Sequence, residues 1–243
     1  MNVTPRRERL RALLAGDRCV YAPSVFDPIS ARIAEDLGFE IGFMASSVPS
    51  AAVLGAPELG VLTLTEFAQQ VRRICRAGSI SLMVVSDNCF GNALNDMRSV
   101  EELESAGVSA INIEDVAPPV SFGSAEGEES WKLIPLEEAV GKMKAALAAR
   151  QDPSLVVAAR TKALSLAGIP ETIRRVQAYE KAGVDAIFLS EARTRREELE
   201  SVHAETRLPL LLGRSWLGEP ELADQRFLAG NGVRMVSLGN ASL

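Results

Sequence analysis

A phrase repeated at several junctions between a helix and a strand constrains the fold of this chain most. The clear copies are Asp36-Leu-Gly-Phe-Glu40, Ser105-Ala-Gly-Val-Ser-Ala110 and Lys181-Ala-Gly-Val-Asp-Ala186, and Gly230-Asn-Gly-Val-Arg234 is a looser one. In each copy the glycine can end a helix in the left-handed conformation, and an apolar residue then begins a strand. Repetition of one junction favours a single repeating architecture over two unrelated domains.

Short β-branched runs alternate with longer segments of helical period, as at Ile33, Ala34 and Leu37, which is the pattern of βα units around a parallel sheet. Eight runs are predicted strands: Cys19–Ala22, Ile41–Ala45, Ser81–Val85, Ala110–Glu114, Leu155–Arg160, Ala186–Ser190, Pro209–Leu212 and Arg234–Leu238. A (β/α)8 TIM-type barrel typically needs about 250 residues. The 243 residues therefore predict one α/β barrel domain spanning residues 1–243.

Two segments depart from an even barrel. Val116–Pro135 is long, polar and rich in Gly, Pro and Ser, and it follows the fourth predicted strand. Loops of this length are commonly lids or binding loops, so we expect a lid on the active face. The sequence ends at Leu243, directly after the eighth strand. The helix that would close the barrel is therefore expected to be absent or to lie outside this sequence.

Composition excludes several classes of partner. The net charge is −6 without a basic block, which argues against nucleic acid and anionic membranes. No apolar run approaches the roughly 18 residues that cross a bilayer. The cysteines Cys19, Cys75 and Cys89 are odd in number and widely spaced, which favours a reduced, cytoplasmic protein. The chain has one histidine, which argues against Ser-His-Asp, Cys-His and His-rich zinc sites.

Two carboxylates follow predicted strands. Asp87 ends the segment that begins at Ser81, and Glu114 ends the segment that begins at Ala110. A parallel barrel gathers the C-terminal ends of its strands at one mouth, where such acids can converge on one cation or substrate. On spacing alone, solvated acids at strand ends are an equally good reading.

Six segments together resemble the isocitrate lyase and phosphoenolpyruvate mutase superfamily, most closely its oxaloacetate decarboxylase branch. They are Ser24-Val-Phe-Asp-Pro-Ile-Ser-Ala-Arg-Ile-Ala34, Ala45-Ser-Ser-Val48, Gly91-Asn-Ala-Leu-Asn95, Ile113-Glu-Asp115, Phe122-Gly123 and Ala159-Arg-Thr161. The resemblance extends over nearly the whole chain. It implies a TIM-type barrel and a lyase that acts on a small 2-oxo or 2-hydroxy acid through an enolate-like intermediate, by decarboxylation or retro-aldol cleavage.

The resemblance also implies roles for individual residues. The Ser46 hydroxyl and the backbone N–H groups of Ser47 and Val48 would hold the substrate carboxylate, and Arg160 would pair with it bidentately. The residues implied to orient the waters of a Mg²⁺ ion are Glu58, Asp87 and Glu114. Family members commonly form tetramers, so a homo-oligomer, dimer or tetramer, is expected.

The chain departs from the family pattern at the presumed site. Val85 stands where an aspartate would contact the metal directly, and Cys89 stands where a glycine is usual. Lys162 replaces an asparagine after Arg-Thr, and Asn240 replaces a histidine after the last strand, where we expect it to contact substrate. An ammonium at Lys162 could balance the acids and polarise an enolate oxygen in place of the metal, so Arg160, Lys162 and Asp87 are the predicted catalytic residues.

Other readings remain open for these residues. Ser46 and Ser47 could cap the following segment, and Arg160 could form a structural ion pair. Cys89 could be a nucleophile or a space-filling residue, and Lys162 could form a Schiff base. The alternative function is a diverged family member without a metal site, acting as a binding protein or as a metal-independent biosynthetic enzyme on a larger substrate.

Overall fold

The predicted barrel is present. The computed structural model describes residues 3–58, 60–117, 131–190, 195–213 and 224–239. Within these residues the strands are β1 Val20–Ala22, β2 Ile41–Met44, β3 Ser81–Val85, β4 Ala110–Glu114, β5 Val156–Thr161, β6 Ala186–Leu189, β7 Leu210–Leu212 and β8 Val233–Ser237. Each predicted strand coincides with an observed one to within one residue at either end. The α/β prediction is confirmed.

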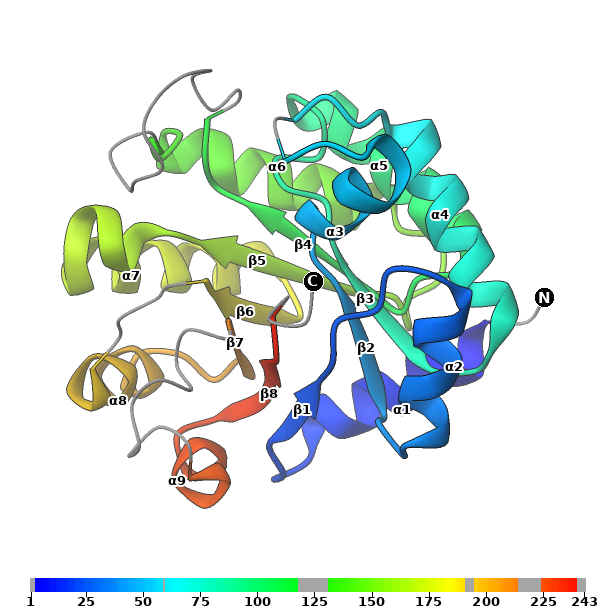
Figure 1. Ribbon diagram of the computed structural model, residues 1–243. Coiled ribbons are helices and arrows are strands. Elements are labelled where there is room, and N and C mark those ends of the chain that lie inside the picture. The colour runs from blue at the N-terminus through cyan, green and yellow to red at the C-terminus, as the bar shows by residue number, and fades with distance from the viewer. Residues whose placement is uncertain (1–2, 59, 118–130, 191–194, 214–223, 240–243) are drawn as a thin grey trace.

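The strands form one parallel sheet that curls around an axis. Their order is β1-β8-β7-β6-β5-β4-β3-β2, so from β2 to β8 each strand pairs with its neighbour in sequence, and β8 pairs with β1. A parallel bridge between Ser24 and Phe43 joins the ends of β1 and β2, where the Val25 amide donates to the Phe43 carbonyl at 2.9 Å. The barrel is thus nearly closed, and Figure 1 looks along it from the mouth.

Helices alternate with the strands and cover the outside of the barrel (Figure 1). The described helical elements are α1 Thr4–Ala15, α2 Pro28–Asp36, α3 Ser47–Pro49, the π-helical turn η1 Ser50–Leu54, α4 Leu64–Ala77, α5 Ala93–Ala106, α6 Leu136–Ala149, α7 Ala163–Ala182, α8 Arg196–Ala204 and α9 Gln225–Gly230. Gly107 and Gly183 follow α5 and α7 with φ of 105° and 96°, as the repeated junction predicts.

Helix α2 presents a different face from the one its apolar spacing suggests. Its buried residues are Ala31 and Ala34, whereas Ile33 is 54% exposed and Leu37 is 71% exposed. Ile29, one turn before Ile33, is also exposed, so the three large side chains form an apolar stripe on the outside. The alanines join the buried cluster on the side where α2 packs against α4, and the larger residues are left without cover among the described residues.

Side chains that point into the barrel fill it from end to end. Strand alternation sends Met83 and Val85 inward, while Leu82 and Val84 pack against the helices. Phe43 and Phe188 stack across the interior, with ring centroids 5.7 Å apart. At the opposite end from the mouth, the apolar face of α1 joins the same buried cluster and closes the barrel.

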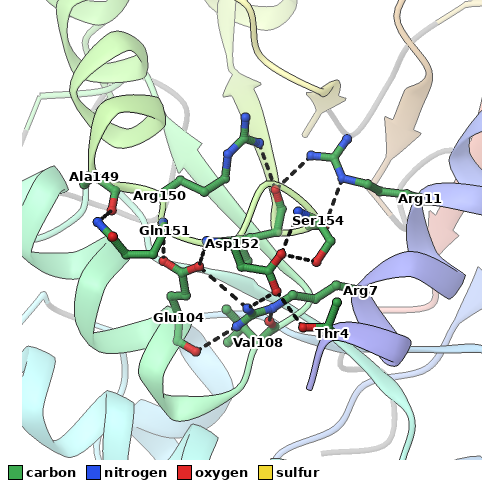
Figure 2. A network of polar contacts seen from close by, with 11 residues as sticks. Thr4, Arg7, Arg11, Glu104, Val108, Ala149, Arg150, Gln151, Asp152 and Ser154 are labelled. Carbon is green, nitrogen blue, oxygen red and sulfur yellow. Dashed lines mark hydrogen bonds and ion pairs between the residues drawn. The ribbon is translucent and has the colours of Figure 1, made fainter. Parts of the chain in front are cut away.

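Charged residues also tie α1 to that closed end, as Figure 2 shows. The Arg7 guanidinium donates to the Val108 and Glu104 carbonyls at 2.8 and 2.7 Å, and to Asp152 Oδ2 at 2.8 Å. The Glu104 carboxylate in turn accepts from the amides of Gln151 and Asp152. These contacts join the N-terminal helix to the segments that enter β4 and β5.

The expected lid is described only at its two ends. Val116 and Leu133 form an antiparallel bridge, and the Ala117 amide donates to the Lys132 carbonyl at 2.8 Å. Residues 118–130, which include the predicted Phe122-Gly123 segment, lie outside the described residues. In the described part of the chain, no helix has the length and apolar character needed to span a bilayer.

Candidate active site

Register brings three side chains to the same mouth. Glu114 ends β4 and pairs in register with Arg160 of β5, and alternation points both side chains into the barrel. Arg160 Nε lies 3.3 Å from Glu114 Oε1, and Lys162 Nζ lies 3.7 Å from the same oxygen. The structure therefore brings the predicted residues Glu114, Arg160 and Lys162 together around one carboxylate oxygen.

This contact is close without being a complete hydrogen bond. Glu114 Oε1 and Arg160 Nε are both buried, and neither has a hydrogen-bond partner among the described residues. The guanidinium instead lies over the Phe188 ring, 5.5 Å from its centroid, which restrains its plane. A structural ion pair would satisfy these atoms, so their unused capacity favours a ligand-binding role for Arg160.

Asp87 joins this group from the loop after β3. Burial raises the pKa of the Asp87 carboxyl well above its usual value, and the neighbouring negative charges of Glu58 and Glu114 raise it further. A hydrogen bond with Ser46 and the positive charge of Arg160 act in the opposite direction. The charges of Glu58 and Glu114 thus act on the Asp87 carboxyl, with Glu114 buried and Glu58 exposed.

The turn after β2 lies at the site, but two of its hydrogen-bonding groups already have partners within the protein. Ser46 is the residue before α3 and makes no capping hydrogen bond with its side chain; its hydroxyl instead bonds to Glu58. The Val48 amide donates to the Ala45 carbonyl at 3.1 Å, so in this structure it is not directed at a substrate carboxylate. Ser47 begins α3, between them.

Lys162 connects the site to the end of the expected lid. Its ammonium lies 4.5 Å from the centroid of the Trp131 ring, a cation–π contact, as well as near Glu114. Trp131 lies just before Leu133, which pairs with Val116. The charge of Lys162 is therefore shared between the acid at the barrel mouth and an aromatic residue of the lid segment.

The two unusual residues of β3 and its loop are both buried. Val85 is fully buried in the apolar interior beside Phe43 and Phe188, and its side chain has no atom that could coordinate a metal. Burial raises the pKa of the Cys89 thiol, which disfavours a reactive thiolate and supports the space-filling reading. Asn240 lies outside the described residues.

A cavity of about 300 Å³ opens beside these residues. Ser46, Glu58 and Asp87 lie on its polar side. Its apolar wall is formed by Leu62, Phe67, Val85, Phe90, Val116, Ala117 and Trp131. The cavity thus combines a few polar groups with a larger apolar surface, as small-molecule sites generally do, and its described lining does not include Glu114, Arg160 or Lys162.

Asp115 is a supporting residue to which the sequence pattern gave no role. It is fully buried, and its Oδ2 accepts from Thr161 and Tyr179 at 2.7 Å and from Arg175 at 3.1 Å. Its Oδ1 accepts weakly from the Lys162 amide at 3.3 Å. These bonds fix the end of β5 next to Glu114. Its position in the sequence could have indicated this supporting role, because Asp115 directly follows Glu114, a predicted acid at the end of a strand.

The carboxylates at the mouth offer few direct ligands for Mg²⁺. Among the described residues, no group of three or more His, Cys, Asp or Glu side chains is arranged to hold a metal directly. Mg²⁺, however, is usually held by one or two carboxylates together with waters and substrate oxygens. The orphaned oxygen of Glu114 and the nearby Asp87 carboxyl meet that smaller requirement. The residues fit an ion held largely through water and substrate.

The model of the family described as phosphoenolpyruvate phosphomutase matches residues 10–243. The chain belongs to this family. It is 49% identical over 238 residues to an oxaloacetate decarboxylase of Rhodopseudomonas palustris, covering 98% of this chain and 80% of that protein. A second oxaloacetate decarboxylase, from Bradyrhizobium diazoefficiens, is 49% identical with the same coverage.

The solved structures agree with this membership. A phosphonopyruvate hydrolase in complex with oxalate and Mg²⁺ has a TM-score of 0.82 and 33% identity, covering 97% of this chain and 80% of that one. The resemblance inferred from the six sequence segments is therefore confirmed. So is the prediction of a carbon–carbon lyase class, since the curated relatives carry the name of a decarboxylase.

Proposed function

We propose that this family member is a lyase of the oxaloacetate decarboxylase type, which cleaves the carbon–carbon bond one carbon away from the oxo group of a small acid, so that the released electron pair can form an enolate. One observation supports this most: Arg160, Lys162 and Asp87 gather around Glu114 at the barrel mouth, in a chain 49% identical to oxaloacetate decarboxylases. A small dicarboxylate with a 2-oxo group matches a site that offers two cations and several acids.

Arg160 binds and orients the substrate carboxylate. Its guanidinium, restrained over Phe188, can present two parallel N–H donors to a carboxylate. Ser46 and Ser47 lie on the neighbouring turn and would contact the same end of the substrate. Val48 takes part through its amide only if the turn shifts, because that amide is bonded to Ala45.

In the decarboxylation, the bond between C3 and the leaving carboxylate breaks, CO₂ departs, and the electron pair forms the enolate of pyruvate. A Mg²⁺ ion held by Asp87, Glu114 and Glu58 through waters would stabilise the negative charge on the enolate oxygen. Lys162 adds a second positive charge on the same side. A proton then adds to C3, and we expect the Val116–Pro135 segment to exclude stray water while the enolate exists.

Release of CO₂ from oxaloacetate, followed as pyruvate formation above the uncatalysed rate, tests this function. We expect activity that requires Arg160, with Arg160→Lys losing roughly 100-fold because a single ammonium cannot replace the bidentate contact. Calorimetry should show oxalate binding that is strengthened by Mg²⁺. Oxaloacetate turnover no faster than in buffer, together with no oxalate binding, would refute the proposal.

A second candidate function is metal-independent chemistry on a larger substrate. Two observations favour it: Val85 supplies no metal ligand, and most of the wall of the cavity beside Asp87 is apolar. In that case Lys162 would carry the role of the cation. Activity that survives EDTA but is lost in Lys162→Met supports this candidate, and activity lost in EDTA and restored by Mg²⁺ supports the first. Trapping with borohydride tests the Schiff-base reading of Lys162.

We also propose that the protein self-associates through α2. The exposed stripe of Ile29, Ile33 and Leu37 is an apolar surface that a second copy would cover. Light scattering should give the mass of a dimer or tetramer for the natural chain and a smaller mass for Ile33→Glu. A monomeric mass for both would contradict this.

Cys19, Cys75 and Cys89 are free and buried. Free thiols of this kind suit a reducing compartment, and on this basis we propose the cytoplasm as the location. Cell fractionation with a tagged chain would decide it.

A further inference from the structure

The loop that carries Asp87 has an unusual backbone. Among the described residues, the non-glycine residues with positive φ are Asp87 at 48°, Cys89 at 53° and Phe90 at 65°, all in this one loop. Residues with a Cβ disfavour this left-handed region, so such a conformation persists only where surrounding contacts enforce it. The position of the Asp87 carboxyl therefore depends on whatever holds residues 86–91.

Four carbonyls of this loop accept hydrogen bonds from residues outside the loop. The Asp87 carbonyl accepts from the Glu114 amide at 2.7 Å, and the Cys89 carbonyl accepts from the Ser99 hydroxyl at 3.1 Å. The carbonyls of Asn88 and Gly91 both accept from the ammonium of a single residue, Lys142, at 2.8 and 2.5 Å.

Lys142 reaches the loop from α6, beneath the mouth. Its third hydrogen bond goes to Asp96 Oδ1 at 3.0 Å, so each of the three ammonium protons has an acceptor. The Lys142 side chain is 3% exposed and that of Asp96 is 0% exposed. Lys142 and Asp96 each stand within the buried faces of their helices, at positions where an apolar residue is usual.

Stability alone is a weak reason for this buried pair. Removing two charges from water costs free energy that their attraction often fails to recover, and apolar residues commonly serve as well. Burial raises the pKa of Asp96 to about 6 despite the adjacent ammonium, and its Oδ2 has no hydrogen-bond partner among the described residues. An apolar pair would lack any donor for the Asn88 and Gly91 carbonyls.

We propose that Lys142 is a positioning residue for the reaction: its ammonium holds the 86–91 loop in its left-handed conformation and so directs Asp87 at Ser46, Glu58 and Glu114. The same loop places Phe90 in the cavity wall, edge-on to Phe67 at 6.1 Å. Lys142 contacts neither substrate nor metal in this role. The catalytic part of the proposal rests on the proposed lyase function, and the conformational part rests on the geometry alone.

The test compares Lys142→Met with the double variant Lys142→Met/Asp96→Asn. The single variant leaves Asp96 charged and unpaired, whereas the double variant removes both charges and keeps the fold measurable. If Lys142 positions the loop, kcat for oxaloacetate falls at least tenfold in both variants, even where the double variant has recovered the natural Tm. Recovery of kcat together with Tm would overturn the proposal, since Lys142 would then only neutralise Asp96.

Arg7→Met is the matched control. Arg7 is also 3% exposed and also donates to two carbonyls and a carboxylate, but at the closed end of the barrel. Its loss should lower Tm and leave kcat unchanged within twofold at a temperature where the variant is folded. A comparable loss of kcat in Arg7→Met would show that any buried cation has this effect, and would also overturn the proposal.

Hydrogen exchange separates this proposal from the proposed function. The Cys89 amide donates to the Ser86 carbonyl at 2.7 Å inside the loop, and its exchange should accelerate at least tenfold in the double variant, with exchange in β4 unchanged. If the natural protein does not turn over oxaloacetate, the lyase proposal fails and this measurement still decides the role of Lys142. Unchanged exchange at Cys89 would refute it.

Discussion

The two ends of the barrel both contain buried charges, but the surroundings shift the pKa of an aspartate in opposite directions at the two ends. At the closed end, hydrogen bonds from Ser154, Arg7 and Thr4 overcome the effect of burial and hold the pKa of Asp152 far below its usual value. At the mouth, burial and like charges raise the pKa of Asp87, and Glu114 Oε1 has no hydrogen-bond partner among the described residues.

This contrast separates stabilisation from function. Charges whose hydrogen bonds are complete resist the loss of a partner and have no free hydrogen-bonding capacity for a ligand. Charges with incomplete partners cost stability and keep their capacity for a substrate or a cation. Substitutions at the two ends should therefore differ in sign as well as in size.

The largest effect is expected for Asp87→Asn, which removes a carboxylate from the barrel mouth. Loss of the carboxylate should lower kcat/KM for oxaloacetate roughly 100- to 1,000-fold. Without Mg²⁺ or substrate, the variant should be more stable at pH 7 by about 1 kcal/mol, which is about 2–4 °C in Tm for a chain of this size. Kinetics and thermal melts measure both.

The sign of the stability effect follows from the raised pKa. The folded state binds the Asp87 proton more tightly than the unfolded chain does, so ionised Asp87 destabilises the fold at neutral pH and protonated Asp87 does not. The stabilisation by Asp87→Asn should therefore shrink as pH falls through the folded pKa. A lower Tm for the variant at pH 7 would contradict this reading of the mouth.

The second-largest effect is expected for Arg7→Met, which removes the guanidinium that joins α1 to the closed end of the barrel. It removes the ion pair with the buried Glu104 carboxylate and leaves the carbonyls of Val108 and Glu104 without this donor, a change that typically costs about 3 kcal/mol or more. Denaturant unfolding should show that loss. The exposed ion pair of Arg98 with Glu101 is the control, because Arg98→Ala should cost less than about 1 kcal/mol. Equal losses would remove the distinction between the two settings.

A third prediction concerns the pH dependence of the stability that Asp152 provides at the closed end. Asp152→Asn should destabilise the protein by about 1 kcal/mol at pH 7, because it removes accepted hydrogen bonds. Since the folded pKa of Asp152 is lowered, its contribution is present above the unfolded value near 3.9 and is lost as pH falls below it. Urea unfolding of both proteins at pH 7 and pH 3.5 tests this: the difference should narrow in acid. A constant difference would mean that ionisation plays no part.

The smallest effect is expected for Trp131→Leu. It removes a cation–π contact with Lys162 that is worth roughly 0.5–1 kcal/mol. KM for oxaloacetate should rise about two- to fivefold, an amount that corresponds to that energy, with Tm unchanged. Trp131→Phe keeps an aromatic face and should recover most of the affinity. If Leu and Phe behave alike, the contact does not contribute to the bound state.

Much of the site could be predicted from the sequence. The residues that could not be predicted were missed for one shared reason. Glu114 and Arg160 were recognisable because they stand at strand ends within family segments, and Asp87 was recognisable because it follows a predicted strand. Lys142 and Asp96 were not recognised, although each is a charged residue on an otherwise apolar helical face. Which partner such a residue meets depends on helix packing, and α5 and α6 pack side by side only in the folded barrel.

The sequence by itself determined the alternation of strands and helices, the left-handed glycines after α5 and α7, and which acids reach the mouth, because these depend on local backbone preference and on periods of two and 3.6 residues. Only the tertiary structure decided that the Val48 amide is occupied, that Ile33 and Leu37 of α2 are exposed, and that Lys142 supports the Asp87 loop. Those outcomes depend on contacts between segments far apart in the chain, where packing distance and hydrogen-bond geometry select one partner among several that the sequence allows.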